Sequence, residues 1–214
     1  MPEQNTYTSN YTPPSFEGGW EESALIIFVR NPVLGKVKTR LAATLGDENA
    51  LAAYKYLLQH TKDIAQNVPV TKFVFYADEI NDDDLWNEYV KKLQTGNDLG
   101  ERMRHAFEQV FALGYKKASI IGSDCYELSG HILTTAFAQL HKFEIILGPA
   151  SDGGYYLLGM QSPLKNLFNN ITWSSNTVFA DTMKTIRGFG LLVGLLPQLS
   201  DVDEEKDINF KYKD

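Results

Sequence analysis

From Ala24 onward, short apolar runs alternate with segments whose apolar residues recur at helical spacing. The short runs are bounded by turn-forming or polar residues, which is typical of β-strands. The predicted strands are Ala24–Val29, Lys72–Ala77, Ala118–Ile121, Glu144–Leu147 and Tyr155–Gly159. Helices are expected between them.

Three of the intervening segments have recognisable helix boundaries. The predicted helix over Asp98–Ala112 has apolar residues at every fourth position, with Asp98 as N-cap and Glu101 completing a capping pattern. Ser129 is placed to cap a second helix. A third helix, Asn176–Arg187, is expected to stop at Gly188.

Strands that alternate with helices of this length indicate βαβ units and a mostly parallel sheet. We therefore predict one α/β domain over residues 23–214. Residues 1–22 are polar, contain Pro-Pro and Gly-Gly pairs and lack an apolar period, which predicts a loosely ordered N-terminal arm. In a sheet of this kind the ligand binds beyond the carboxyl ends of the strands.

Composition limits the partners of the domain. The formal net charge of −7 disfavours generic binding to nucleic acid or to an anionic membrane surface. A single cysteine excludes an internal disulfide and fits a reducing compartment. The apolar runs are too short to span a bilayer, and the N-terminus lacks a signal-peptide pattern. We expect a cytoplasmic protein without a membrane span.

A basic loop follows the first predicted strand. It holds four cations, Arg30, Lys36, Lys38 and Arg40, and Gly35 would let the backbone approach a ligand closely. These cations could neutralise a diphosphate at the ligand edge of the sheet. The chain contains neither a P-loop nor a G-x-G-x-x-G motif, and a solvated turn with ordinary surface lysines is the alternative.

A carboxylate follows the strand Ala118–Ile121, where Gly122 and Ser123 lead into Asp124. Mg²⁺ or Mn²⁺ binds one or two carboxylates together with phosphate oxygens and water, so Asp124 is a candidate metal ligand. The alternative is that Asp124 caps the next helix or turn, although Ser129 lies nearer to that helix.

Two further segments with candidate carboxylates follow. Asp152, Gly153 and Gly154 lie in a glycine-rich stretch after a strand, which indicates either a backbone bent around a ligand or a plain turn. Asp201 and Asp203 are two residues apart, so both could reach one cation from an extended segment. An acidic tail on a solvated helix is the competing interpretation of the second pair.

In order, the motifs NPVLGKVKTRLA, NDLGERMRHAF, IGSDCYEL, GPASDGGYYLLGM, ITWSSNTVF and LPQLSDVDEEKDI resemble those of a bacterial glycosyltransferase-like family. That family belongs to the nucleotide-diphospho-sugar transferase superfamily, and the resemblance covers about residues 24–208. It implies a GT-A-like fold with three α/β/α layers.

The resemblance also implies roles for single residues. It places Gly35, Lys38 and Arg40 at the phosphates of a nucleotide. Asp124 is similar to the carboxylate that holds the divalent cation in GT-A enzymes, and Asp203 with Asp201 resembles a second carboxylate beside the metal. Asp152 would border the donor sugar or the acceptor with Gly153 and Gly154, and it is the candidate for orienting or deprotonating the acceptor hydroxyl.

Two positions depart from the family pattern. Arg30 stands where the family usually has lysine, which keeps the charge and changes the geometry of phosphate binding. Tyr126 stands where the family usually has proline, which loosens the turn beside Asp124.

The resulting hypothesis is a transferase that uses a nucleotide-activated small-molecule donor with Mg²⁺ or Mn²⁺, most simply a glycosyltransferase with a nucleotide-diphospho-sugar. Arg30, Lys36 and Ser123 join the residues expected at the nucleotide. One alternative is a nucleotidyltransferase acting on a nucleoside triphosphate and a phosphorylated substrate. Another is a nucleotide-binding module without catalysis. The base, sugar, acceptor and oligomeric state are left open.

Overall fold

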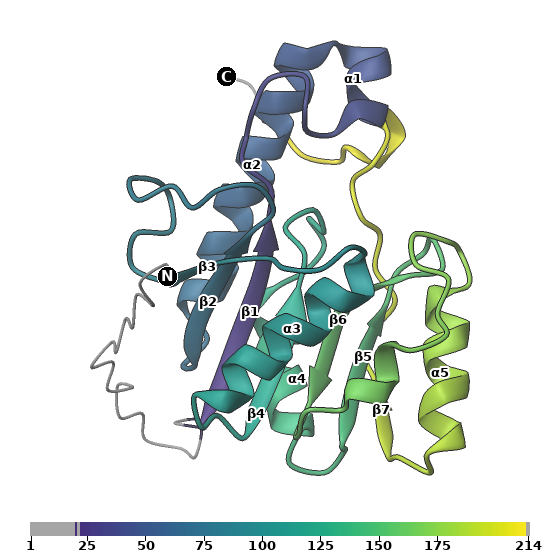
Figure 1. The fold of residues 1–214 in the computed structure, drawn as a ribbon. Helices are drawn as coiled ribbons and strands as arrows, with labels where there is room; N and C mark the ends of the chain where they lie inside the picture. The colour runs from purple at the N-terminus through teal and green to yellow at the C-terminus, as the bar shows by residue number, and fades with distance from the viewer. Residues whose placement is uncertain (1–19, 21, 213–214) are drawn as a thin grey trace, which may run out of the picture.

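The computed structural model describes residue 20 and residues 22–212 (Figure 1). The strands are β1 (Ser23–Val29), β2 (Thr71–Tyr76), β3 (Val90–Leu93), β4 (Lys117–Ile121), β5 (Ile145–Pro149), β6 (Tyr155–Met160) and β7 (Val193–Leu195). The helices are α1 (Thr39–Leu45), α2 (Asp47–Gln66), α3 (Leu99–Ala112), α4 (Gly130–Gln139) and α5 (Val178–Gly188), with short 3₁₀ helices η1 (Lys165–Phe168) and η2 (Glu205–Asp207). The predicted arm, residues 1–22, lies almost entirely outside the described residues.

The strands form one seven-stranded sheet in the order β3-β2-β1-β4-β6-β5-β7. β1 pairs in parallel with β2 and β4, and β5 pairs in parallel with β7. β6 alone runs antiparallel to both of its neighbours. The predicted mostly parallel α/β fold is therefore confirmed. Its carboxyl-end edge receives the loops after β1 and β4 and the turn that leads into β6.

Strict alternation along β1 sends successive side chains to opposite faces of the sheet. Leu25, Ile27 and Val29 contribute to one core, which is closed by residues of α2 and α4. Ala24 and Ile26 contribute to the other, which is closed by residues of α3 and α5. Both faces of the sheet are thus covered by helices, and the domain has three α/β/α layers (Figure 1).

The five predicted strands are all present, with ends that differ by one or two residues. β3 and β7 were not predicted from the apolar pattern, because both are short strands at the edges of the sheet. β3 carries Lys91 and Lys92 and is not fully buried at any position, while β7 has only three residues with Gly194 at its centre. Polar or short edge strands give a weak periodic signal.

The predicted helix caps agree with the structure at two positions. The side chain of Asp98 accepts a hydrogen bond from the Glu101 amide at the start of α3, and that of Ser129 accepts one from the Ile132 amide at the start of α4. The third predicted helix begins two residues later than expected, at Val178, and includes Gly188 as its last residue. The structure adds α1 and α2 between β1 and β2.

No helix within the described part of the chain is long and apolar enough to cross a membrane.

Candidate functional site

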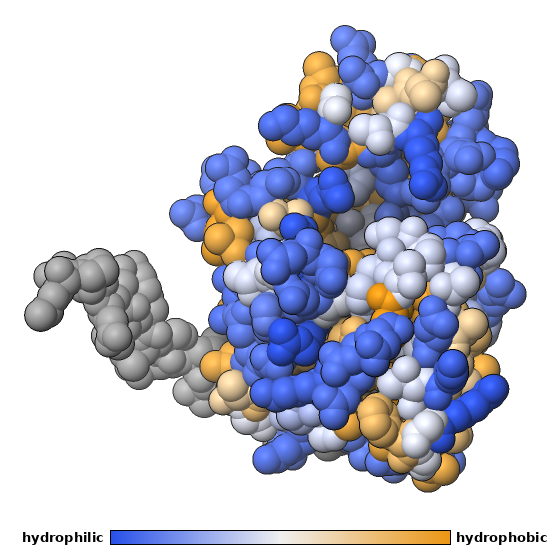
Figure 2. All heavy atoms as spheres, turned by 45° about the vertical axis from the view of Figure 1, so that its right-hand side comes forward, coloured by the Kyte–Doolittle hydropathy of each residue, from blue (hydrophilic) through white to orange (hydrophobic). Residues whose placement is uncertain are grey.

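A cavity of about 940 Å³ lies at the carboxyl-end edge of the sheet. Its walls come from the loop after β1, the ends of β1 and β4, the start of α3, the turn before β6, the turn before α5 and the segment after β7. A recess is visible in Figure 2 below the part of the molecule that carries α1, on a surface that is mostly hydrophilic. All of the predicted site residues line the cavity except Gly35 and Gly153.

The basic loop ends at Lys38, whose backbone is in the left-handed conformation. Lys38 has φ 47° and is the N-cap of α1, so the predicted loop is shorter than expected and Arg40 lies in the first turn of a helix. Gly35 also has a positive φ, 73°, which allows the chain to turn before that helix. Glycine is therefore explained at this position by backbone conformation, and contact of Gly35 with a ligand stays a prediction.

The ammonium group of Lys38 lies between two carboxylates. Its Nζ is 3.0 Å from Asp124 Oδ2 and 3.2 Å from Asp203 Oδ1, and only 7% of its side chain is exposed. Arg40 reaches Asp203 at 3.6 Å with a side chain that is 76% exposed. Burial acts to lower the pKa of Lys38, but attraction by the two carboxylates outweighs it, so its pKa lies above the usual value.

Main-chain contacts bring these carboxylates together from distant parts of the sequence. The amide of Val202 donates a hydrogen bond of 2.9 Å to the carbonyl of Asp124, which sets the segment after β7 beside the end of β4. Gly122 leaves room for this carboxylate, since a Cβ on it would lie 2.9 Å from Asp124 Oδ1. The carboxyl group of Asp207 then accepts the amides of Asp203 and Glu204. The acidic segment is therefore packed at the cavity, and Asp124 caps no helix, because Ser129 caps α4.

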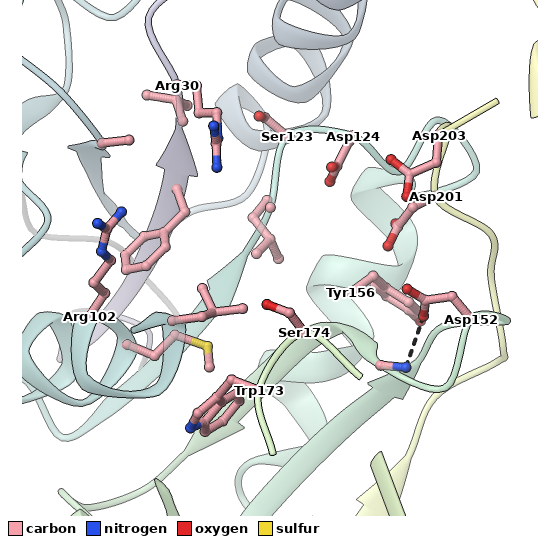
Figure 3. Close-up of a pocket in the computed structure, with 18 of the residues that line it drawn as sticks. Arg30, Arg102, Ser123, Asp124, Asp152, Tyr156, Trp173, Ser174, Asp201 and Asp203 are labelled. Carbon is pink, nitrogen blue, oxygen red and sulfur yellow. Dashed lines mark hydrogen bonds between the residues drawn. The ribbon is translucent and has the colours of Figure 1, made fainter. Parts of the chain in front are cut away.

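Asp201 has a buried carboxyl oxygen at this end of the cavity. Its Oδ1 has no hydrogen-bond partner among the described residues. Burial, followed by the nearby charges of Asp124 and Asp152, raises the pKa of Asp201 to about 7. Asp201 lies beside Asp203 at the same end of the cavity (Figure 3), but no ion pair joins it to Lys38 in the part of the chain that the structure describes.

These carboxylates suit a divalent cation in part. One oxygen of Asp124 and one of Asp203 point at a common position, which Lys38 Nζ holds, and Asp201 offers an oxygen that lacks a partner. Among residue 20 and residues 22–212, no group of three or more His, Cys, Asp or Glu side chains is arranged to hold a metal by itself. These carboxylates therefore do not complete a cation site by themselves, and Mg²⁺ or Mn²⁺ would need further oxygens from phosphate and water at the position that Lys38 Nζ occupies.

Asp152 lies in the turn that leads into β6. Its Oδ1 accepts a hydrogen bond of 2.8 Å from the amide of Gly154, and both residues line the cavity (Figure 3). Gly153 has φ 92°, and a Cβ on it would lie 2.1 Å from the carbonyl oxygen of Asn176. The glycine-rich turn thus has a structural reason in its packing against the segment before α5. The role of Asp152 at the acceptor stays a prediction.

Tyr54 of α2 joins the ends of β1 and β4. Its buried hydroxyl accepts the amide of Arg30 at 2.9 Å and lies 3.3 Å from Ser123 Oγ. Burial raises the pKa of this hydroxyl, so it stays protonated and able to donate. No periodic pattern marks Tyr54 as a site residue, because its role depends on where α2 crosses the sheet.

The far side of the cavity contains residues that sequence reasoning assigned no role. Arg102, in the first turn of α3, and Trp173 with Ser174, before α5, line this side (Figure 3). The ring of Trp173 packs so closely on Gly100 that a Cβ there would lie 2.1 Å from Trp173 Nε1. Arg102 lies in the motif NDLGERMRHAF, and Trp173 with Ser174 lies in ITWSSNTVF. Membership of these two motifs of the family resemblance was the feature of the sequence that could have identified them as site residues.

Comparison with known proteins agrees with the fold. The family model described as "Uncharacterized protein conserved in bacteria (DUF2064)" matches residues 58–175. A solved structure from Desulfovibrio desulfuricans G20, provisionally named a nucleotide-diphospho-sugar transferase, is 32% identical and superposes with a TM-score of 0.79 over 86% of this chain and 83% of that chain. No curated protein matches the chain.

Two more distant structures share the fold alone. The inositol-1-phosphate CTP transferase of T. maritima is 13% identical, with a TM-score of 0.52 over 91% of this chain and 94% of that chain. Glucosyl-3-phosphoglycerate synthase of Mycobacterium tuberculosis, solved with Mn²⁺, uridine diphosphate and glucosyl-3-phosphoglycerate, is 9% identical, with a TM-score of 0.52 over 84% of this chain and 70% of that chain. The predicted superfamily resemblance, and with it the prediction of a transferase, is confirmed by the 32% identical structure.

Proposed function

The chain belongs to the DUF2064 family of bacterial proteins, and on that premise we propose that it is a metal-dependent glycosyltransferase that uses a nucleotide-diphospho-sugar donor. The observation that carries the proposal is the meeting of two opposite charge sets in one cavity. The cations Lys38 and Arg40 enter it from the start of α1, and Asp124 and Asp203 enter it from the end of β4 and the segment after β7.

The cations suit the diphosphate of the donor. A nucleoside diphosphate that leaves a sugar gains negative charge, and fixed cations stabilise that charge when they lie where it develops. Arg40 is exposed on the first turn of α1 and can form two hydrogen bonds to phosphate oxygens, while Lys38 supplies a single compact charge. Lys36 extends the same positive wall, and Ser123 lies beside it.

The carboxylates suit the cation that bridges the diphosphate. Asp124 and Asp203 would hold Mg²⁺ or Mn²⁺ in the position now taken by Lys38 Nζ, with Asp201 as a further ligand. Such a cation, when bound, neutralises charge on the phosphate oxygens. Lys38, released from the carboxylates, would turn to the diphosphate.

Asp152 is the proposed group at the acceptor hydroxyl. Its Oδ1 is held by the Gly154 amide, which leaves Oδ2 to accept a proton or a hydrogen bond from the acceptor. The side chain is fixed by the turn rather than by a charged partner among the described residues, so an acceptor can reach it from the open cavity.

A thermal-shift screen of nucleoside diphosphates, triphosphates and nucleotide sugars tests the proposal, each with and without Mn²⁺. A ligand at a hundred times its dissociation constant stabilises the folded state by about 2.7 kcal/mol. We expect metal-dependent stabilisation by one class of nucleotide sugar, followed by release of a nucleoside diphosphate when an acceptor is added. Release of pyrophosphate from a triphosphate would instead indicate nucleotidyl transfer. Binding that ignores metal, without turnover of any donor, would indicate a module without catalysis.

A further inference from the structure

We propose that the cavity has a second anion-binding subsite, formed by Arg30, Arg102 and the Trp173–Ser174 turn, which holds a phosphate or carboxylate group of the acceptor. The inference rests on the proposed function, because it assigns an acceptor to the half of the cavity away from the predicted cation. In Figure 3 Arg102 lies across the cavity from Asp124, Asp201 and Asp203, and Arg30 lies on the Arg102 side of Ser123.

Arg102 is oriented for such a group before any ligand arrives. Its Nε donates a hydrogen bond of 3.2 Å to the carbonyl of Gly96, which fixes the plane of the guanidinium. The two terminal amino groups remain available toward the cavity. No ion pair neutralises Arg102 within the described residues, whereas Arg104 on the same helix is paired with Glu108 at 3.3 Å.

Arg30 brings a second unpaired cation to the same space. Its backbone at the end of β1 is fixed by the hydroxyl of Tyr54, and its side chain is exposed in the cavity wall. Across the part of the chain that the structure describes, no carboxylate forms an ion pair with Arg30. Two planar cations with free donors line this side of the cavity, and a guanidinium group binds the oxygens of a phosphate or carboxylate through paired hydrogen bonds.

The Trp173–Ser174 turn closes this side of the cavity, and its main chain is held by packing on both sides. Ser174 has φ 61°, a left-handed conformation that costs a non-glycine residue free energy and is retained only where the surroundings impose it. Packing of Trp173 on Gly100 holds one side of the turn, and contact of Asn176 with Gly153 holds the other. The result is a serine hydroxyl that points into the cavity and has no hydrogen-bond partner among the described residues (Figure 3).

The unpaired charges of the subsite favour an anionic occupant over a neutral one. An uncharged sugar or base would leave both guanidinium groups without a counter-charge, whereas a phosphate or carboxylate would pair with both. The carboxylates at the other end of the cavity would repel the same anion. An acceptor held here by its anionic group would extend from Arg30 and Arg102 toward the end of the cavity that holds Asp152.

Titration of the full chain with inorganic phosphate and, separately, with acetate tests the subsite without nucleotide or metal. Binding is followed by calorimetry and by tryptophan fluorescence, because Trp173 lies in the subsite. We expect at least one of the two anions to bind, which also shows whether phosphate or carboxylate is preferred. Arg102→Gln and Arg30→Gln should each weaken that binding at least tenfold. Arg102→Lys should give a smaller loss of affinity, since lysine keeps the charge but lacks the two parallel N–H donors of the guanidinium group.

Arg104→Gln is the matched control, because it removes an arginine from the same helix outside the cavity, and its affinity should equal that of the wild type. Arg40→Gln locates the anion. If Arg40→Gln abolishes binding and Arg102→Gln leaves it unchanged, the anion binds only at the basic loop and the subsite does not exist. Absence of binding by the wild-type chain to either anion overturns the proposal as well.

The result is separable from the proposed function. Metal-dependent stabilisation by a nucleotide sugar depends on Asp124 and should persist in Arg102→Gln. If nucleotide sugars stabilise the protein but anion binding does not depend on Arg102, the subsite alone is refuted. If anion binding depends on Arg102 but no nucleotide stabilises the protein, the proposed glycosyltransferase function alone is refuted.

Discussion

The two ends of the cavity differ in how their charges are balanced. At the carboxylate end, Lys38 lies between Asp124 and Asp203, so opposite charges neutralise one another within the folded chain. At the arginine end, Arg30 and Arg102 form no ion pair with any described residue. A substitution at the first end removes contacts that the protein makes by itself, whereas a substitution at the second removes contacts that only a ligand would complete.

This difference separates stability from binding. Breaking a balanced group leaves a partly buried charge without its partner, which lowers the free energy of unfolding. Removing an unpaired, accessible cation leaves the folded state almost unchanged and lowers affinity for an anion. The following substitutions test whether the two ends behave in these two ways.

Asp124→Ala should abolish metal-dependent turnover, a loss on the order of 10³-fold or more, because it removes a carboxylate from the proposed cation position. The far-ultraviolet circular dichroism spectrum should stay that of the wild type. Initial rates with the donor found in the thermal-shift screen, measured across Mn²⁺ concentrations, provide the measurement. Asp63→Ala, which alters an exposed carboxylate on α2, is the control. Normal turnover by Asp124→Ala would show that the metal assignment is wrong.

Asp201 should make the metal-free protein lose stability as pH rises from about 4 to about 7. The unfolded chain releases this proton near its ordinary pKa of 3.8, while the folded chain holds it up to a pKa of about 7. The folded state therefore binds more protons across that window, and the loss is on the order of 3 kcal/mol.

Urea unfolding in chelator at several pH values measures this loss, with Asp201→Asn as the comparison. The difference in stability between variant and wild type should grow in favour of the variant as pH rises through the window. A constant difference from pH 4 to pH 8 would contradict the burial of this carboxyl group.

Lys38→Met should destabilise the metal-free protein by about 2 kcal/mol, since it leaves Asp124 and Asp203 facing each other without a cation. That corresponds to a fall in Tm of about 4–8 °C for a chain of this size. Mn²⁺ should restore more stability to this variant than it adds to the wild type. Lys36→Met, an exposed lysine of the same loop, should unfold as the wild type does. Equal effects of the two substitutions would mean that the central ammonium contributes nothing specific.

Arg102→Gln should change the free energy of unfolding by less than about 0.5 kcal/mol, because its guanidinium makes one hydrogen bond and no ion pair with the described residues. The same variant should lose anion affinity. Thermal unfolding beside Lys38→Met gives the comparison directly. A large loss of stability in Arg102→Gln would show that the arginine end, too, is part of what holds the fold together.

The fold was predictable where burial imposes a period on the sequence. β1, β2 and β4 are central strands buried on both faces, and their apolar runs were visible without any structure. β3 and β7 were not, because an edge strand needs apolar residues on fewer positions. The caps Asp98 and Ser129 were predictable because capping is a local interaction between residues three positions apart.

The site was predictable only where a loop follows a buried strand. Asp124 and the basic loop met that condition. The pairing of Lys38 with both Asp124 and Asp203 did not, because it depends on a main-chain contact between residues 124 and 202 that no local pattern encodes. Arg102 and Trp173 were missed for the same reason, since their convergence depends on how α3 packs against the segment before α5.

The position of Lys38 has a consequence for the order in which ligands bind. On the proposed function, a divalent cation that arrives alone would have to displace an ammonium group that lies between two carboxylates, and the displaced group would then have no anionic partner. A cation that arrives with a diphosphate supplies that partner at once. Each ligand should therefore bind more tightly in the presence of the other, by the same factor in both directions. One lysine side chain would then make loading of the protein cooperative within a single domain.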